Sequence, residues 1–523
     1  MEQGRGILDL PNEILDKIVG QFCQHCAGDA LKPVDSVDRA EFQGTLIALT
    51  KVNRRMGRVA RRILFHVVSS DHNSLPKLLR ILMEQPAFAP YIRVVDLGGH
   101  AGDQDCALHY LPEQGAEELG ALVKSVGRFE ALPAIEEVYR RGSLSARPPL
   151  GEFDRVPGAR FNVFVLFKLA KNINSVIIRS EWPLAVFAQF PTPAEIKDKL
   201  KIKVVNIESK TKLKINLDRT VPLSGIQELH LTSNIINLWT AKHVVDLSKA
   251  ADLLVRLPNL RRLSSQGSTG SFCTAIVGDS VFSNLTELDL ASCSLTLPSL
   301  RDILSSCSAK LKRFRFSCES ESDNTNHIGT GIAGADIIQI LDMAELSGSL
   351  HSLEVDTSDS ETFTNIWGWP TFARNFRTIP SLGHFASLRH LCISADNIYF
   401  PAMSPGMLVQ DDNSGPLRLV QFLPAGLETL EITGITAIHL QDVEALAQAC
   451  EKRDPLHALK RIVFRADGAL HLADVDDEPE QVMEGRKFEN MAMAELFAAA
   501  GVEYEFEQPE FFTTFYSGTW DSI

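Results

Sequence analysis

Near the N-terminus, two cysteines and a histidine lie close together in the segment Cys23-Gln-His25-Cys26. Thiolates and imidazoles are the side chains that hold structural zinc, which takes four ligands at close range, usually as two such pairs. No second Cys-x-x-Cys pair follows, and the next cysteine, Cys106, is distant in the sequence. The spacing therefore predicts a plain thiol pair in a loop, with no metal site and no cofactor.

A glycine pattern in the second half of the chain has the spacing of a dinucleotide-binding loop. It runs Gly329-Thr-Gly331-Ile-Ala-Gly334, and a helical pattern follows from Ala335. Such a loop must directly follow a strand, because its glycines make the turn that presents the helix end to pyrophosphate. Here the nearest strand pattern ends near Phe316, and a polar run intervenes. A nucleotide-dependent enzyme is therefore a rival hypothesis only, and no active site is predicted.

Composition and charge limit the class of protein. The 523 residues are 45% hydrophobic and 23% charged, which indicates a folded chain. The net charge of −14 argues against nucleic-acid binding, and no apolar run reaches the roughly 18 residues that a membrane span needs. Nine cysteines are an odd number scattered along the chain, and the N-terminus lacks an apolar signal core. We expect reduced thiols and a cytoplasmic or nuclear location.

One short pattern recurs through most of the chain. Leu285-Thr-Glu-Leu-Asp-Leu290-Ala-Ser-Cys293-Ser-Leu295 reads L-x-x-L-x-L-x-x-C-x-L, and residues 226–236 repeat this frame with Asn234 in place of the cysteine. Shorter copies start at Ile92, Ile173, Leu311, Leu350, Leu388, Leu427 and Leu459. A short strand places alternate residues on one face, which a single copy cannot bury alone, so neighbouring copies must stack. The Asn or Cys after the strand is expected to turn inward and bond the backbone of the turn.

Helical spacing separates these predicted strands. It occurs at residues 241–257, 297–307, 335–346 and 440–451. The alternation resembles leucine-rich repeats, and this resemblance implies an α/β fold, a curved solenoid with a parallel inner sheet. We assign residues 91–465 to the solenoid and residues 71–90 to a connecting helix or linker. Residues 466–523, which contain many more acidic than basic residues, are predicted to form a capping unit and tail, with a helix at 491–500 and a strand at 502–506.

Residues 1–70 do not follow the repeat and predict a small helical module. Leu10, Ile14 and Ile18 share one helix face after Asp9, with Pro11 at the helix start. A second apolar stripe runs through Leu49, Val52, Met56, Val59, Ile63 and Val67, spaced for one continuous helical face.

The pattern L-P-x-E-I-L, followed by L-x-x-V-x-R and A-R-x-x-L-F, resembles the F-box in the form common in fungal proteins. That resemblance implies binding to a Skp-type adaptor, which connects such proteins to a cullin ubiquitin ligase. The implied adaptor-binding residues are Leu10, Pro11, Ile14, Leu15, Ile18, Leu49, Val52, Asn53, Arg54 and Leu64. One departure from the family is the segment Gly20–Gly44, which is longer than the usual link between the two halves of the motif and either forms a harmless loop or obstructs docking.

Together these features predict a non-catalytic, substrate-recruiting F-box subunit of a Skp–cullin–F-box ubiquitin ligase, whose repeats bind an unknown protein target. The alternative is a leucine-rich-repeat interaction scaffold with a divergent F-box and no ligase role. Neither nucleic acid nor a membrane is an expected partner. Outward strand positions are the candidate substrate-binding residues, and they are Glu228, His230, Glu287, Asp289, Arg389, Glu428 and Glu431.

Overall fold

The computed structural model describes the chain in separate segments. These are residues 10–23, 25–26, 36–70, 74–97, 166–167, 169–179, 223–232, 245–254, 256–270, 282–318, 332–357, 378–399, 418–435, 440–453, 456–466 and 493–507. They divide into two compact units, Met1–Ser265 with Ala275–Val281 and Gln266–Thr274 with Phe282–Ile523. Within the described segments, no helix is both long enough and apolar enough to cross a membrane.

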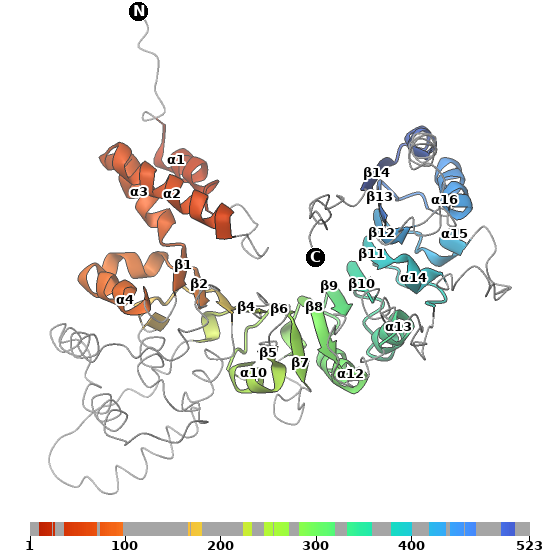
Figure 1. The fold of residues 1–523 in the computed structure, drawn as a ribbon, viewed down its shortest axis with the longest axis horizontal. Helices are drawn as coiled ribbons and strands as arrows, with labels where there is room; N and C mark the ends of the chain where they lie inside the picture. The colour runs from red at the N-terminus through yellow and green to blue at the C-terminus, as the bar shows by residue number, and fades with distance from the viewer. Residues whose placement is uncertain are drawn as a thin grey trace, which may run out of the picture. The chain divides into compact units, whose positions relative to one another are not determined.

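The first unit begins with three helices, labelled in Figure 1, that form the N-terminal module. They are α1 (Asn12–Gly20), α2 (Ser36–Val52) and α3 (Arg54–Leu64). Their shared apolar core contains Leu15, Val19, Cys23, Leu46, Met56, Val59, Ala60 and Ile63. Burial of these side chains stabilises a module that is too small to hold its fold by helix propensity alone.

Two details of this module differ from the sequence prediction. The stripe from Leu49 to Val67 is not one helix, because Asn53 has an extended backbone that ends α2 and starts α3. Val52 consequently lies outside the core, with 60% of its surface exposed. In addition, α2 already starts at Ser36, so the second part of the Gly20–Gly44 segment is helical. Residues 27–35 of that segment lie outside the described residues.

The rest of the first unit is built on parallel strands in chain order. The strand order is β1-β2-β3-β4-β6, and the pairs β1–β2, β2–β3 and β3–β4 are parallel. The strands are β1 (Val67–Ser70), β2 (Val94–Leu97), β3 (Ser175–Ile178), β4 (Glu228–Thr232), β5 (Val245–Asp246) and β6 (Arg262–Gln266). The helices and 3-10 turns are α4 (Ser74–Glu84), η2 (Pro86–Tyr91), η4 (Leu223–Gly225) and α10 (Leu247–Leu254). Strand β1 was not predicted, since Val67-Val-Ser-Ser lacks the repeat frame.

The second unit continues the same construction. Its strands are β7 (Ser268–Gly270), β8 (Glu287–Leu295), β9 (Arg313–Cys318), β10 (Ser352–Asp356), β11 (His390–Ser394), β12 (Thr429–Ile435), β13 (Arg461–Ala466) and β14 (Glu503–Glu507). From β8 to β14 each strand pairs in parallel with the next. The helices are η5 (Phe282–Asn284), α12 (Leu297–Ser306), α13 (Gly334–Met343), α14 (Ala395–Ile398), α15 (Arg418–Phe422) and α16 (Leu440–Lys452). Figure 1 shows α13, α15 and α16 on one side of these strands.

Alternation within each strand decides which side chains enter the core. In β8, Leu288 and Leu290 are fully buried and register with Phe314 and Phe316 of β9. Cys293 is also buried and its Sγ donates to the Ala291 carbonyl at 3.3 Å, but β8 continues to Leu295, so Cys293 lies within the strand and not after it as expected. Each predicted copy of the repeat forms a strand, and parallel strands with helices on one face fit a solenoid.

The predicted helices also agree with the structure, with one exception. Helices α12, α13 and α16 occupy the expected segments. In the predicted helix 241–257, strand β5 occupies Val245–Asp246 and α10 begins only at Leu247. Near the C-terminus, residues 493–499 are helical and β14 follows, as expected for a last repeat-like unit.

Candidate functional site

The start of α1 and the turn between α2 and α3 are held together by one arginine. Arg55 donates from Nη2 to the Leu10 carbonyl at 2.6 Å and from Nε to Asn12 Oδ1 at 3.0 Å. The Asn53 side chain accepts hydrogen bonds from the Arg55 and Met56 backbone N–H groups, which caps α3. The two halves of the F-box-like pattern therefore lie next to each other at this end of the module.

Exposed apolar side chains surround this junction. Pro11 and Ile14 lie at the start of α1, and the exposed fraction of Ile14 is 40%. Val52 and Arg54 flank the cap residue and are also exposed. Apolar groups left in water at such a junction are available to a protein partner, which would gain stability by covering them.

The remaining predicted adaptor residues are less accessible. Leu10, Ile18, Leu49 and Leu64 are half-buried. Leu15 has no exposed surface and belongs to the core of the module, so it cannot contact an adaptor without opening that core. Its predicted contact role is corrected to a packing role. Asn53 is half-buried, and its side-chain oxygen is used by the helix cap.

The second candidate surface is the strand face opposite the leucine core of the second unit, which we call the open face. Its central row follows the register Asp289–Arg315–Glu354 across β8, β9 and β10. Arg315 Nε lies 2.8 Å from Glu354 and 3.9 Å from Asp289. Burial raises the pKa of the Glu354 carboxyl, while the charge of Arg315 lowers it. Acid and base thus alternate across neighbouring strands.

Cys392 of β11 interrupts this row, and ion pairs resume toward the C-terminal end of the sheet. Glu431 of β12 forms an ion pair with Arg465 of β13, which also pairs with Glu507 of β14. Arg461 pairs with Glu505 at 2.6 Å. The open-face ionic residues from β8 to β14 are Glu287, Asp289, Arg313, Arg315, Glu354, Asp356, Glu431, Arg461, Arg465, Glu503, Glu505 and Glu507. Carboxylates outnumber arginines among them, so the open face is acidic.

The predicted substrate-binding residues of the second unit lie in different settings. Glu287 and Asp289 lie on the open face, paired to Arg313 and Arg315. Glu428 precedes β12 and pairs with Lys460 at 2.5 Å, which lowers the pKa of its carboxyl. Glu431 is on the open face as predicted.

Arg389 is exposed and also bonds to the backbone of the fold. Its Nη1 donates to the backbone carbonyls of Ala386, Leu388 and Gly426. These contacts join the turns before β11 and β12, so the Arg389 guanidinium holds the backbone of two neighbouring repeats. Its substrate contact stays a prediction.

In the first unit, Glu228 and His230 are neighbours on one face of β4. Glu228 pairs with Arg262 of β6 at 3.2 Å. His230 is 5% exposed, and burial together with the charge of Arg262 lowers its pKa to about 4. Its imidazole is therefore neutral at pH 7 and too enclosed to recognise a charged target, which corrects its predicted role.

The arginines of the open face were missed by the sequence prediction. Arg313-Phe-Arg315-Phe and Arg461 to Arg465 have the two-residue period of a strand. This period could have predicted them, because it places both arginines of each pair on the sheet face that points away from the core phenylalanines.

The glycine pattern near residue 330 does not gain a phosphate-binding geometry. Gly329 and Gly331 lie outside the described residues. Gly334 begins α13 and is packed so tightly against Asn397 that an added Cβ would overlap the amide. The Ala333 N–H already donates to the Asp336 carboxylate at 3.3 Å. Packing thus accounts for Gly334 without a nucleotide.

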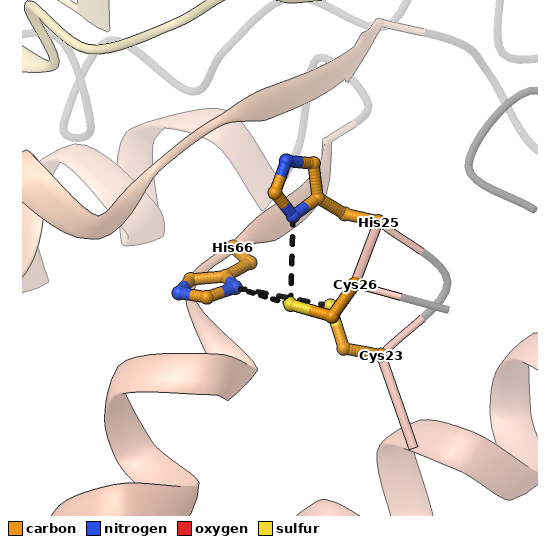
Figure 2. Close-up of side chains that lie close together, drawn as sticks. All are labelled: Cys23, His25, Cys26 and His66. Atoms are coloured by element: carbon orange, nitrogen blue, oxygen red, sulfur yellow. Dashed lines mark hydrogen bonds between the residues drawn. The ribbon is translucent and has the colours of Figure 1, made fainter. Parts of the chain in front are cut away.

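The Cys23–Cys26 pair has two histidine side chains next to it, one of which its local sequence did not indicate. His66, at the end of α3, brings its Nδ1 to 3.2 Å from Cys26 Sγ and 4.0 Å from Cys23 Sγ. His25 Nδ1 lies 3.6 Å from Cys26 Sγ, and Figure 2 shows both imidazole rings turned toward the sulfur atoms. Hydrogen bonds from Cys26 and from both histidines lower the pKa of the Cys23 thiol to about 3. The hydrogen bond between the two thiols raises the pKa of Cys26.

Comparison with known proteins agrees with the repeat geometry. A family model described as a leucine-rich repeat domain matches residues 205–463. No curated protein matches the chain. The matched segment includes strands β4 to β12 and the first half of β13, whose leucine-lined parallel register is described above. Residues 205–463 of this chain are therefore a leucine-rich repeat domain.

Proposed function

We propose that the protein is the substrate-recruiting F-box subunit of a Skp–cullin–F-box ubiquitin ligase. The observation that carries the proposal is the junction at Arg55, which holds the L-P start of α1 against the exposed turn containing Val52 and Arg54. These are the segments that the F-box resemblance implies for adaptor binding. Their exposed apolar side chains supply the contact surface, and a leucine-rich repeat domain follows them in the chain.

The mechanism needs proximity and no catalytic side chain. The N-terminal module would dock on the adaptor while the repeats hold a target, which raises the effective concentration of the target near the ubiquitin-charged enzyme. An odd number of scattered cysteines, which we expect to be reduced, suits the cytoplasm or nucleus, and we propose that location.

The open face of the second unit is the proposed target surface. Its carboxylates outnumber its arginines, and this favours a target with a basic patch. Because several of these charges are half-exposed, binding should weaken as salt is added. The ion pairs along the register keep the side chains in fixed positions, so the surface is preorganised for a partner.

The adaptor test compares single substitutions in the full-length protein. Ile14→Asp and Val52→Asp should each lower affinity for a Skp-type adaptor at least about tenfold, because a buried apolar contact becomes a desolvated charge. Ile81→Asp is the matched control, since Ile81 of α4 is 42% exposed and Ile14 is 40% exposed. Surface plasmon resonance with purified adaptor measures the affinities.

The outcomes separate the ligase role from a scaffold role. Binding that is lost in both N-terminal variants and kept in Ile81→Asp supports the proposal. Absence of binding by the wild-type protein contradicts it and leaves a repeat scaffold as the function. Once a target is known, a photo-crosslinker at Ser352 on the open face should capture it, whereas one at the exposed Met343 of α13 should not.

A further inference from the structure

The four side chains Cys23, His25, Cys26 and His66 form a compact donor set. Each offers one ligand atom, and these atoms all lie within 4.8 Å of one another. The cluster draws on two parts of the first unit that are forty residues apart in sequence. Figure 2 shows that they converge from the turn after α1 and from the end of α3.

The distances within the cluster match those of a tetrahedral metal site. With Zn–S bonds of about 2.3 Å and Zn–N bonds of about 2.05 Å, a sulfur and a nitrogen ligand lie about 3.6 Å apart. The three sulfur–nitrogen separations described above are 3.2, 3.6 and 4.0 Å, which bracket that value. Little movement is needed to place an ion at the centre.

The backbone fixes the ligands before any ion arrives. The Cys23 N–H donates to the Gly20 carbonyl at 3.0 Å, and the Cys26 N–H donates to the Cys23 carbonyl at 2.9 Å, which makes a tight turn. The His66 carbonyl accepts from the backbone N–H groups of Arg93 and Val94, which anchors this residue to β2. A preorganised site loses less conformational entropy on binding, which favours affinity.

We propose that Cys23, His25, Cys26 and His66 bind one structural zinc ion. Two thiolates and two imidazoles are a donor set suited to zinc, and four protein ligands complete a tetrahedral shell without a water position. The ion joins the turn after α1 to the junction between α3 and β1. It therefore ties the start of the segment after Gly20 to the residue that precedes β1, independently of whether the module binds an adaptor.

The first test is the metal content of the full-length protein, expressed with zinc and purified without chelator. Plasma mass spectrometry should find about one zinc per chain. Cys26→Ser and His66→Ala should each weaken zinc binding by about 100-fold or more and leave far less than one ion bound after dialysis. Cys392→Ser, in β11 of the second unit, is the matched cysteine control and should keep its zinc.

A second test uses the wild-type protein alone, so that it does not depend on the folding of a variant. Replacement of zinc by Co²⁺ should produce the intense visible absorption of a tetrahedral site and a thiolate-to-cobalt charge-transfer band. Wild-type protein that holds no zinc and shows no such spectrum overturns the proposal. A Cys23–Cys26 disulfide in the purified protein, found by peptide mass mapping, overturns it as well, because a disulfide cannot supply thiolates.

Discussion

Gly57 of α3 lies directly against the backbone of Thr50 in α2, and a Cβ on Gly57 would be only 2.7 Å from the Thr50 carbonyl oxygen. A backbone atom cannot move aside as a flexible side chain can. The absence of a side chain at residue 57 therefore sets how closely the two helices approach, and with them the arrangement of the whole N-terminal module.

This contact predicts that Gly57→Ala destabilises the module by about 1–3 kcal/mol, since the methyl group forces the helices apart. Thermal unfolding, with hydrogen exchange of α2 and α3 amides, measures the loss. Gly44→Ala in α2 is the control, because nothing lies within 4 Å of its added Cβ. There the higher helix propensity of alanine should stabilise by about 0.5–1 kcal/mol. Equal effects at both positions would contradict the packing explanation.

Asn53 offers a way to separate helix capping from adaptor contact. Asn53→Ala should cost about 1 kcal/mol and speed hydrogen exchange in the first turn of α3, because the Arg55 and Met56 N–H groups lose their acceptor. Asn53→Asp keeps an acceptor oxygen and should retain most of the stability. If Asn53→Asp remains stable but loses the Skp-type adaptor, the side chain contacts the adaptor as well as capping the helix.

If Gly334 is required for packing and not for nucleotide binding, its substitution should change stability. Gly334→Ala should lower stability by about 1–3 kcal/mol, because the Cβ would displace Asn397, whose Oδ1 accepts a hydrogen bond from Thr357 at 2.9 Å. Gly348→Ala, with nothing within 4 Å, should change stability by less than about 0.5 kcal/mol. The wild type should not bind a dye-linked nucleotide resin, and retention that millimolar free nucleotide reverses would revive the enzyme hypothesis.

His230 predicts a loss of stability in acid. Its pKa falls from 6.5 to about 4 on folding, so the unfolded chain takes up the proton first and the native state loses stability as the pH falls. In the window between these values the loss is about 1.4 kcal/mol per pH unit. Urea titrations of the wild type and of His230→Gln from pH 7 to pH 4.5 measure the unfolding free energy at each pH. Its slope against pH should be smaller in His230→Gln, by the equivalent of one bound proton. An unchanged slope would mean that the pKa of His230 is the same in the folded and the unfolded chain.

The sequence predicts the repeats well because each strand carries its own local signal. Leu288 and Leu290 are read from the L-x-x-L-x-L frame, and the structure buries both. Features that depend on distant contacts are not visible in this way. His66 lies forty residues from Cys26, so local spacing showed only a thiol pair where the fold brings four donor atoms together.

Local sequence patterns also gave wrong predictions where the apolar spacing of a helix continued across the end of that helix. The apolar spacing through Val52 and Met56 is that of one helix, yet the cap at Asn53 divides it. Arg389 has the sequence of an outward strand position, and its guanidinium also bonds to three carbonyl groups of neighbouring turns. Hydrogen bonds of this kind depend on how repeats stack and have no signature in a single repeat.

The last strand has a consequence for how copies of the protein behave toward one another. Strand β14 ends the order of described strands, so one of its edges has no strand partner among them. An open edge can recruit another strand and start aggregation, and charged side chains along it oppose that addition. Glu503, Glu505 and Glu507 alternate along β14. A second copy whose β14 approached this edge would bring two rows of glutamates together, which should oppose pairing of two copies through β14.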